Sequence, residues 1–214
     1  VNVISFLNGQ GARLGDKITV VGDFSNNTAQ VWASSSTAAF AKVYRWSMTA
    51  GAFNATPDSI TLSDAGTNAT SSVGPMPSGA FFFNANGISA KKYSATGTLL
   101  GTIPGTVVAT GSNAIRYMGS TGGMDYFATF QYGAGNLNAR VVGMPTDDFA
   151  NAFTYGITPP LGAAANGNGT GDVEIRRNPD GSVDLFVMAT NNGFGVYHTT
   201  TVIPVELSAF AAHA

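Results

Sequence analysis

Two adjacent carboxylates are the first residues whose type and spacing could support chemistry. Asp147 and Asp148 precede Phe149 in a stretch that continues into Pro, Gly, Ala and Asn. A glycoside hydrolase needs an acid and a second carboxylate flanking the bond that it cleaves. Because neighbouring residues of an extended chain point to opposite sides, this pair would need a bend to face one substrate. Solvated loop charges are the simpler interpretation, with ligand binding as the alternative.

Other catalytic arrangements have little support in the sequence. A Ser-His-Asp triad would depend on His198, because His213 lies at the end of the chain, and no serine stands in a Gly-x-Ser-x-Gly elbow. The Gly-rich stretches lack the Gly-Lys-Ser/Thr of a phosphate-binding loop. The sequence therefore favours a non-enzymatic protein with no cofactor.

Metal ligands are also scarce. The chain has no cysteine and two histidines, which excludes disulfides and cysteine-ligated metals and predicts no transition-metal site. Two oxygen-rich turns, 23–27 and 178–181, could bind structural calcium. The Asn-Pro-Asp-Gly sequence of the second turn is equally explained by a type I turn.

Aromatic side chains are better candidates for binding, because they can stack on sugar rings or fill a partner's pocket. The candidates are Trp32, Tyr44, Trp46, Tyr126, Tyr132 and Tyr155. Aromatics placed regularly along strands usually fill the space between sheets, which predicts that Trp32 belongs to the core. Trp46 and Tyr155 lie near strand ends and a loop, so we expect them to be more exposed. With Asp147 and Asp148 they form the predicted ligand-binding set.

The charge content is low and balanced. Charged residues make up 10% of the chain, and the net charge is −2. This leaves no basic surface for nucleic acid, and no apolar run reaches the ~18 residues of a membrane span. Solubility must depend on the many Thr, Ser and Asn side chains, which is typical of an extracellular or cell-surface protein.

The elements that would position these residues repeat along the chain. A strand, turn, strand phrase recurs four times, centred on Trp32, Phe82, Phe127 and Phe186, at intervals of roughly 50 residues. Gly, Asn and Ser separate short β-prone runs, and few helix-forming residues are present. The sequence predicts an all-β fold of four antiparallel β-repeats, either a propeller or a partial propeller.

One β-repeat domain is expected over residues 1–203, followed by a C-terminal linker or tail at 204–214. We place the repeats at roughly 16–64, 65–108, 109–146 and 171–203, and a long loop at 147–170.

Two of the repeats resemble a poorly characterised class of secreted bacterial β-propeller-like proteins of the Bacteroidota type. They are GDKITVVGDFSNNTAQVWAS with KVYRW, and GDVEIRRNPDGSVDLFVMATNNGFGVYH. The segment 203–210, IPVELSAF, resembles the PVEL(S/T)xF phrase that precedes a C-terminal secretion or anchoring module, although the sequence stops at Ala214 before such a module. Asp58-Ser59-Ile60 resembles a Bacteroidota O-glycosylation site, which makes Ser59 a predicted modification site. The resemblance implies an extracellular location and supplies no catalytic motif.

These observations lead to two functional expectations. The first is a non-enzymatic extracellular protein of surface structure, self-assembly or adhesion, in which edge strands of an incomplete ring pair between copies as a ring or filament. The alternative is a carbohydrate-binding or carbohydrate-active propeller with a glycan as its partner.

Overall fold

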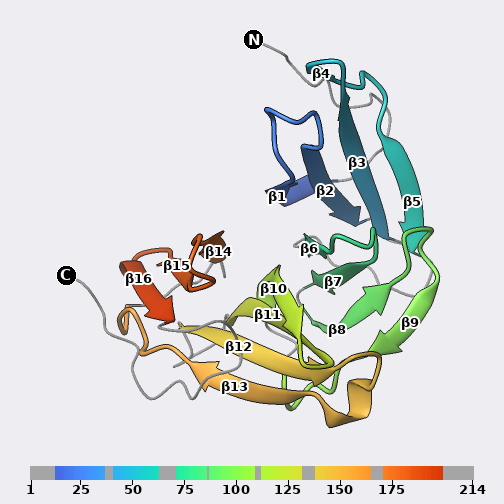
Figure 1. Cartoon of the computed structure of the whole chain (residues 1–214). Helices are drawn as coiled ribbons and strands as arrows, with labels where there is room; N and C mark the ends of the chain where they lie inside the picture. Colours follow the sequence, from blue (N-terminus) through green and yellow to red (C-terminus); the bar gives the residue numbers. More distant parts are fainter. Residues whose placement is uncertain are drawn as a thin grey trace.

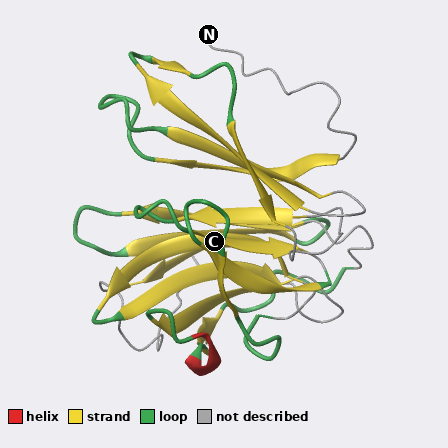
Figure 2. Cartoon of the chain, turned by 90° about the vertical axis from the view of Figure 1, so that its right-hand side faces the viewer, coloured by secondary structure: helices red, strands yellow, loops and turns green. Residues whose placement is uncertain are grey.

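The protein is an all-β structure of four antiparallel sheets. The computed structural model describes residues 13–36, 41–62, 71–85, 87–108, 112–131, 138–164 and 171–199. Its sheets are arranged as the blades of a four-bladed β-propeller (Figure 1). The single short 3-10 turn, η1 (Phe149–Asn151), lies at the rim of the described part of the chain (Figure 2). The predicted fold class is confirmed.

Each blade is formed by strands that follow one another in sequence. The first blade contains β1 (Arg13–Val21), β2 (Gln30–Ser36), β3 (Ala41–Thr49), β4 (Ala52–Phe53) and β5 (Asp58–Leu62). The second contains β6 (Ser71–Pro75), β7 (Phe81–Ala85), β8 (Ile88–Tyr93) and β9 (Leu99–Thr102). The third contains β10 (Ser112–Thr121), β11 (Met124–Gln131), β12 (Asn138–Pro145) and β13 (Phe153–Ile157). The fourth contains β14 (Gly171–Arg177), β15 (Val183–Ala189) and β16 (Gly193–Thr199).

The repeated aromatics lie on the same strand of every blade. Trp32, Phe82, Phe127 and Phe186 lie on β2, β7, β11 and β15, the second strand of each sheet in chain order. The first three are fully buried. The ring centroids of Phe82 and Phe127 are 4.6 Å apart across the boundary between the second and third blades. The repeat in the sequence is therefore the repeat of the blade.

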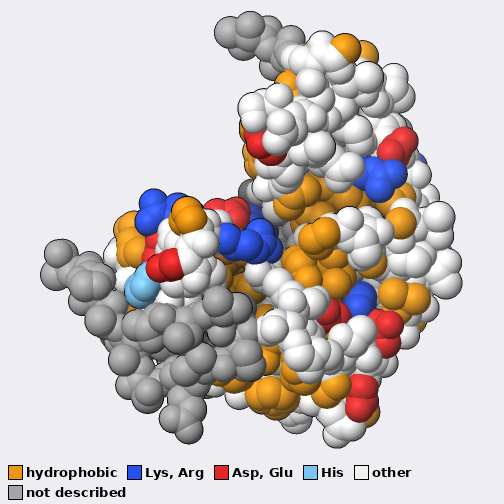
Figure 3. All heavy atoms as spheres, viewed as in Figure 1, with side chains coloured by type: hydrophobic (Ala, Val, Ile, Leu, Met, Phe, Trp, Pro, Cys, Tyr) orange, Lys and Arg blue, Asp and Glu red, His pale blue; other side chains and the backbone are white. Residues whose placement is uncertain are grey.

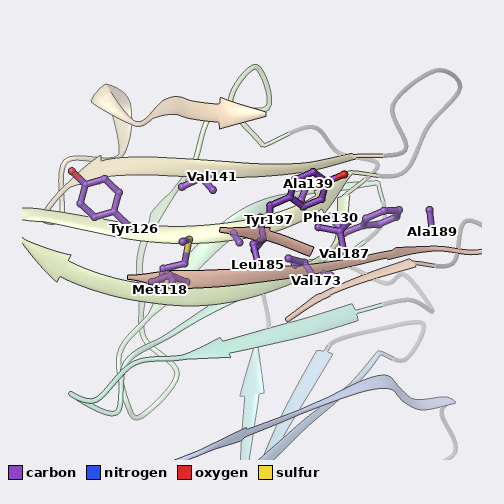
Figure 4. Packing of buried hydrophobic residues seen from close by; sticks show 13 residues of the cluster. Met118, Tyr126, Phe130, Ala139, Val141, Val173, Leu185, Val187, Ala189 and Tyr197 are labelled. Carbon is purple, nitrogen blue, oxygen red and sulfur yellow. The ribbon is translucent and has the colours of Figure 1, made fainter. Parts of the chain in front are cut away.

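Blades pack face to face through apolar clusters. Trp32 of the first blade lies in one cluster with Phe81 and Phe83 of the second. Between the third and fourth blades, Tyr126, Phe130 and Val141 pack with strand residues of the last sheet, among them Val173, Leu185, Val187 and Tyr197 (Figure 4). Because successive side chains of a strand point to opposite faces, the fully buried β7 supplies apolar side chains to the interfaces on both sides of the second blade.

The region expected as a long loop contains regular structure. Residues 153–157 form β13, which pairs with β12 and completes the third blade. The run Phe-Thr-Tyr-Gly-Ile is β-prone but short, and Pro and Gly follow it, so its pairing with Arg140–Gly143 could not be predicted from the sequence. The third blade therefore extends beyond position 146, the expected end of the third repeat.

The first strands of the blades approach one another closely at the centre. A Cβ added to Gly74 on β6 would lie 3.2 Å from the Ile115 carbonyl oxygen and 3.3 Å from the Tyr117 amide nitrogen on β10. The absence of a side chain therefore permits the backbone contact between the second and third blades.

In the described part of the chain, the ring of blades is open on one side. Among the described residues, no apolar cluster joins the first blade to the fourth. Figure 3 shows a hollow between these two sheets, with charged side chains at its inner end. We call this hollow the wedge.

Truncation of a ring between blades should be far more costly than truncation of an exposed ring. We expect Phe127→Ala to lower the free energy of unfolding by about 3–5 kcal/mol, because the cavity at a fully buried interface cannot collapse. Phe24→Ala, the same change at a ring that is 55% exposed, should cost less than about 1 kcal/mol. Urea unfolding of both variants measures the difference, and equal losses would contradict the assigned packing.

Candidate functional site

One guanidinium group contacts the innermost strand of every blade. Arg116 on β10 is buried, and its Nε donates a hydrogen bond to Glu174 Oε2 on β14 at 2.8 Å. Its Nη1 donates to Ser72 Oγ on β6 at 3.1 Å, and its Nη2 donates to the Ile18 carbonyl oxygen on β1 at 3.3 Å. We call Arg116 and these partners, together with Lys17 and Asp172, the hub.

Lys17 and Asp172 complete the hub between the first and fourth blades. Lys17 Nζ donates to the Gly171 carbonyl oxygen and lies 3.5 Å from Asp172 Oδ2. Asp172 Oδ1 is also 3.4 Å from Arg116 Nη2. The hub contains two cations and two anions, so its formal charges balance. Such a network fixes the relative orientation of the strands. Because each charged side chain is already paired, a charged substrate would find no unpaired group of opposite sign in the hub.

None of the four charged residues of the hub is among the site residues predicted from the sequence. A signal was present, because Arg116 interrupts the β-prone run Ala-Ile-Arg-Tyr. A charged residue inside a strand core requires a partner, since an unpaired buried charge is costly.

A small pocket adjoins the hub at the inner end of the wedge. Its volume is about 180 Å³, and its lining combines hub side chains with apolar residues of the first blade. It is lined by Thr19, Val20, Val21, Gly22, Pro75, Arg116, Tyr117, Glu174, Ile175 and Arg177. Ligand sites for drug-sized molecules start near 300 Å³, so this pocket fits a small part of a larger ligand.

Asp147 belongs to a second ion network, which joins the second and third blades. Lys92 on β8 is buried, and its Nζ donates to Asp125 Oδ2 at 2.9 Å and to Asp147 Oδ1 at 2.8 Å. The Ser120 hydroxyl also donates to Asp125. Burial by itself would lower the pKa of Lys92, but the hydrogen bonds to Asp147 and Asp125 outweigh it and the pKa is raised. Asp147 thus holds two blades together.

The other predicted ligand-binding residues do not gather around Asp147. The Asp148 carboxylate accepts a hydrogen bond from Asn151 Nδ2 at 2.7 Å beside η1. Trp46, expected to be exposed, is 2% exposed and packs with Tyr44. Tyr155 is half-buried on β13 and makes an edge-on contact with Tyr126. The four residues therefore lie on the first and third blades and share no described site.

Of the remaining sequence candidates, some lie within the described residues and others outside them. Ser59 lies exposed on β5, which is compatible with its predicted modification. The IPVELSAF segment and Tyr132 lie outside the described residues. Within the described ranges, no helix is long and apolar enough to cross a membrane.

The two proposed calcium turns use their carboxylates locally. Asp23 accepts hydrogen bonds from the Ser25 hydroxyl and amide, which lower its pKa. Asp180 accepts the same pair from Ser182, with the same effect on its pKa. Over the described part of the chain, no three His, Asp or Glu side chains gather as metal ligands. Structural calcium therefore stays a prediction without a described site.

The fourth blade carries a third ion network on its face toward the wedge. Asp184 on β15 accepts from Arg176 Nε at 2.9 Å and lies 2.6 Å from His198 Nδ1. Hydrogen bonds from His198 and Arg176 hold the pKa of Asp184 at about 2, below its ordinary value of 3.8. His198 is thus a strand-face residue oriented by a carboxylate.

The outer rim of the second and third blades has a different chemistry. β9 and β13 each pair on one side only within the described residues. They carry four exposed apolar side chains, each between 41% and 47% accessible: Leu99, Leu100, Phe153 and Ile157. Phe149 of η1 packs against Gly101 of β9, which connects the two strands. We call these four residues the outer-edge surface.

Comparison with known proteins identifies the fold. No protein-family model and no curated protein matches the sequence. A DUF4623 family protein from Bacteroides eggerthii has a similar structure, with a TM-score of 0.65 and 14% identity over 89% of this chain and 47% of that protein. An α-L-arabinofuranosidase from Podospora anserina, solved in complex with cellotriose, gives a TM-score of 0.55 and 12% identity over 95% of this chain and 69% of that protein.

These likenesses concern the arrangement of the sheets. At 12–14% identity they show a shared fold alone. The chain spans about half the length of the Bacteroides eggerthii protein.

The hub should contribute strongly to stability. We expect Arg116→Leu to lower the free energy of unfolding by about 2–3 kcal/mol, because it removes the hydrogen bonds that tie β10 to the other three innermost strands. Glu174 loses its cation, whereas Asp172 keeps Lys17. The matched change Arg45→Leu breaks an exposed pair with Asp58 and should cost less than about 1 kcal/mol. Chemical denaturation measures the loss in the free energy of unfolding for each variant. Similar losses for Arg116→Leu and Arg45→Leu would contradict the hub's role.

The Asp184 network predicts a pH dependence of defined sign. Because the pKa of Asp184 is about 2 in the folded protein, its ionised form stabilises the fold above about pH 4, and this contribution is lost as the pH falls toward 2. Asp184→Asn should therefore have a lower free energy of unfolding than the wild type at pH 5, and this difference should shrink by on the order of 1 kcal/mol at pH 2. Urea unfolding at both pH values measures the difference. It would be the same at both pH values if folding did not change the pKa of Asp184.

Proposed function

We infer that this chain is a non-enzymatic extracellular β-propeller protein that self-associates through the outer edges of its blades. The observation that carries this proposal is the outer-edge surface, where two edge strands combine one-sided backbone pairing with exposed apolar side chains. Strands of this kind are templates for pairing with another chain. A role in surface structure or adhesion follows, since multiple edges on one molecule permit rings or filaments.

Composition and fold support an extracellular location for this self-association. The surface is poor in charge, and charge is what usually keeps crowded proteins apart. The fold likeness to the Bacteroides eggerthii protein agrees with the Bacteroidota-type repeats seen in the sequence. The predicted carboxylate pair does not favour an enzyme, because Asp147 and Asp148 are engaged by Lys92 and Asn151.

Charge introduced at the outer edge should prevent self-association. We expect the wild-type mass in solution to rise with concentration, and Leu100→Lys and Ile157→Lys to remain monomeric at a tenfold higher concentration, because a charged edge opposes strand pairing. Light scattering combined with electron microscopy measures mass and shape.

Phe194→Lys is the matched control, since Phe194 is an exposed apolar residue on the fourth blade. It should associate as the wild type does. A wild-type protein that stays monomeric throughout the concentration range would refute the proposed function.

A further inference from the structure

The fourth blade presents to the wedge a face on which Met188 and Phe194 are exposed. Val173, Leu185, Val187 and Tyr197 point to the third blade, so the alternate residues lie on the opposite face. We call this set the fourth-blade face: Glu174, Arg176, Phe186, Met188, Phe194 and His198. The registers Glu174↔Phe186, Met188↔Phe194 and Asp184↔His198 place its members side by side. Trp32 and Phe82, on the corresponding second strands, are fully buried at blade interfaces, whereas Phe186 is only half-buried.

Two rings and a thioether form the apolar part of this face. The rings of Phe186 and Phe194 are stacked, with centroids 6.1 Å apart and planes inclined by 28°. Phe194 is 62% exposed, and its neighbour Met188 is 47% exposed. A supported but accessible ring is suited to contact a flat apolar surface of a ligand.

The charged members of the face are already neutralised within the chain. Glu174 pairs with Arg116 at 2.8 Å, and Arg176 and His198 both contact Asp184. A charged ligand would therefore have to compete with existing ion pairs. The same groups are still accessible as hydrogen-bonding partners, because 66% of the Arg176 side chain and 54% of the Glu174 side chain are exposed.

The opposite wall and the inner end of the wedge complete the surroundings. Ile18 and Val20 of the first blade are exposed and uncharged. The 180 Å³ pocket reaches Glu174 from the hub side, and Arg177 and Thr19 also line it. A ligand on the fourth-blade face could thus extend one small polar unit into this pocket.

We propose that the fourth-blade face binds a neutral oligosaccharide. A sugar ring has an apolar face, which stacks on Phe194, and a rim of hydroxyls, which can donate to Glu174 and accept from Arg176. Its lack of charge leaves the hub and the Asp184 network intact. This binding uses a surface separate from the outer edge, so it stands independently of the proposed self-association.

The experiment is a binding screen against an immobilised panel of neutral oligosaccharides built of glucose, xylose, arabinose or mannose, with oligogalacturonate as the charged comparison. We expect binding to at least one neutral member and a markedly weaker response to oligogalacturonate. Phe194→Ala should weaken that binding at least tenfold, because truncation of an aromatic anchor removes the stacking surface. Phe153→Ala is the matched control on the outer edge and should bind as the wild type does.

Each other outcome overturns the proposal. Failure to bind any neutral member would do so directly, and so would equal weakening by the Phe194→Ala and Phe153→Ala variants. If the Phe194→Ala variant instead forms assemblies of lower mass than the wild type does, the fourth-blade face is a contact between copies. The first two results leave the self-association test with Leu100→Lys unaffected, so the two proposals fail separately there. The third result would also make Phe194→Lys weaken the assembly, which distinguishes a contact on the fourth-blade face from one on the outer edge.

Discussion

The arrangement of the four blades depends on the pairing of one buried guanidinium. Arg116 reaches Ile18, Ser72 and Glu174, and so ties the innermost strands of the other three blades to its own. Face-to-face packing joins the first sheet to the second, the second to the third and the third to the fourth, but no apolar cluster of described residues joins the first sheet to the fourth. The hub connects these two sheets through polar contacts. Because Arg116 is buried, each of its donors that lost its partner would remain desolvated, so small displacements of the strands cost free energy.

The few charged residues of this chain are used mainly in ion networks within and between the blades. Lys92 with Asp125 and Asp147 links the second and third blades, and Arg176 with Asp184 and His198 stiffens the fourth. The remaining surface is left to hydroxyls, amides and a few apolar side chains. Recognition by this protein is therefore expected to depend on shape and on neutral chemistry rather than on electrostatic attraction.

The sequence predicted the blades better than it predicted the site. Periodic aromatics such as Trp32 and Phe82 report local strand patterns, and these patterns are set by residues close in the chain. Trp46 was misjudged because its exposure depends on what packs over the third strand of its blade, which no local pattern encodes. The hub was missed for the same reason, since Arg116 and Ile18 are separated by 98 positions. β13 was missed because five residues between a turn and a Pro-Gly stretch carry too weak a signal.

The order of the strands has a consequence for how this chain folds. Every sheet is assembled from sequence neighbours, so each can form through short loop closures, which are fast. The contact between Lys17 and Gly171, by contrast, spans 154 positions. During synthesis the first three blades can be complete before the last one leaves the ribosome. Until it does, Arg116 lacks its acidic partners, so the contacts at the axis cannot be completed before the fourth blade has been synthesised.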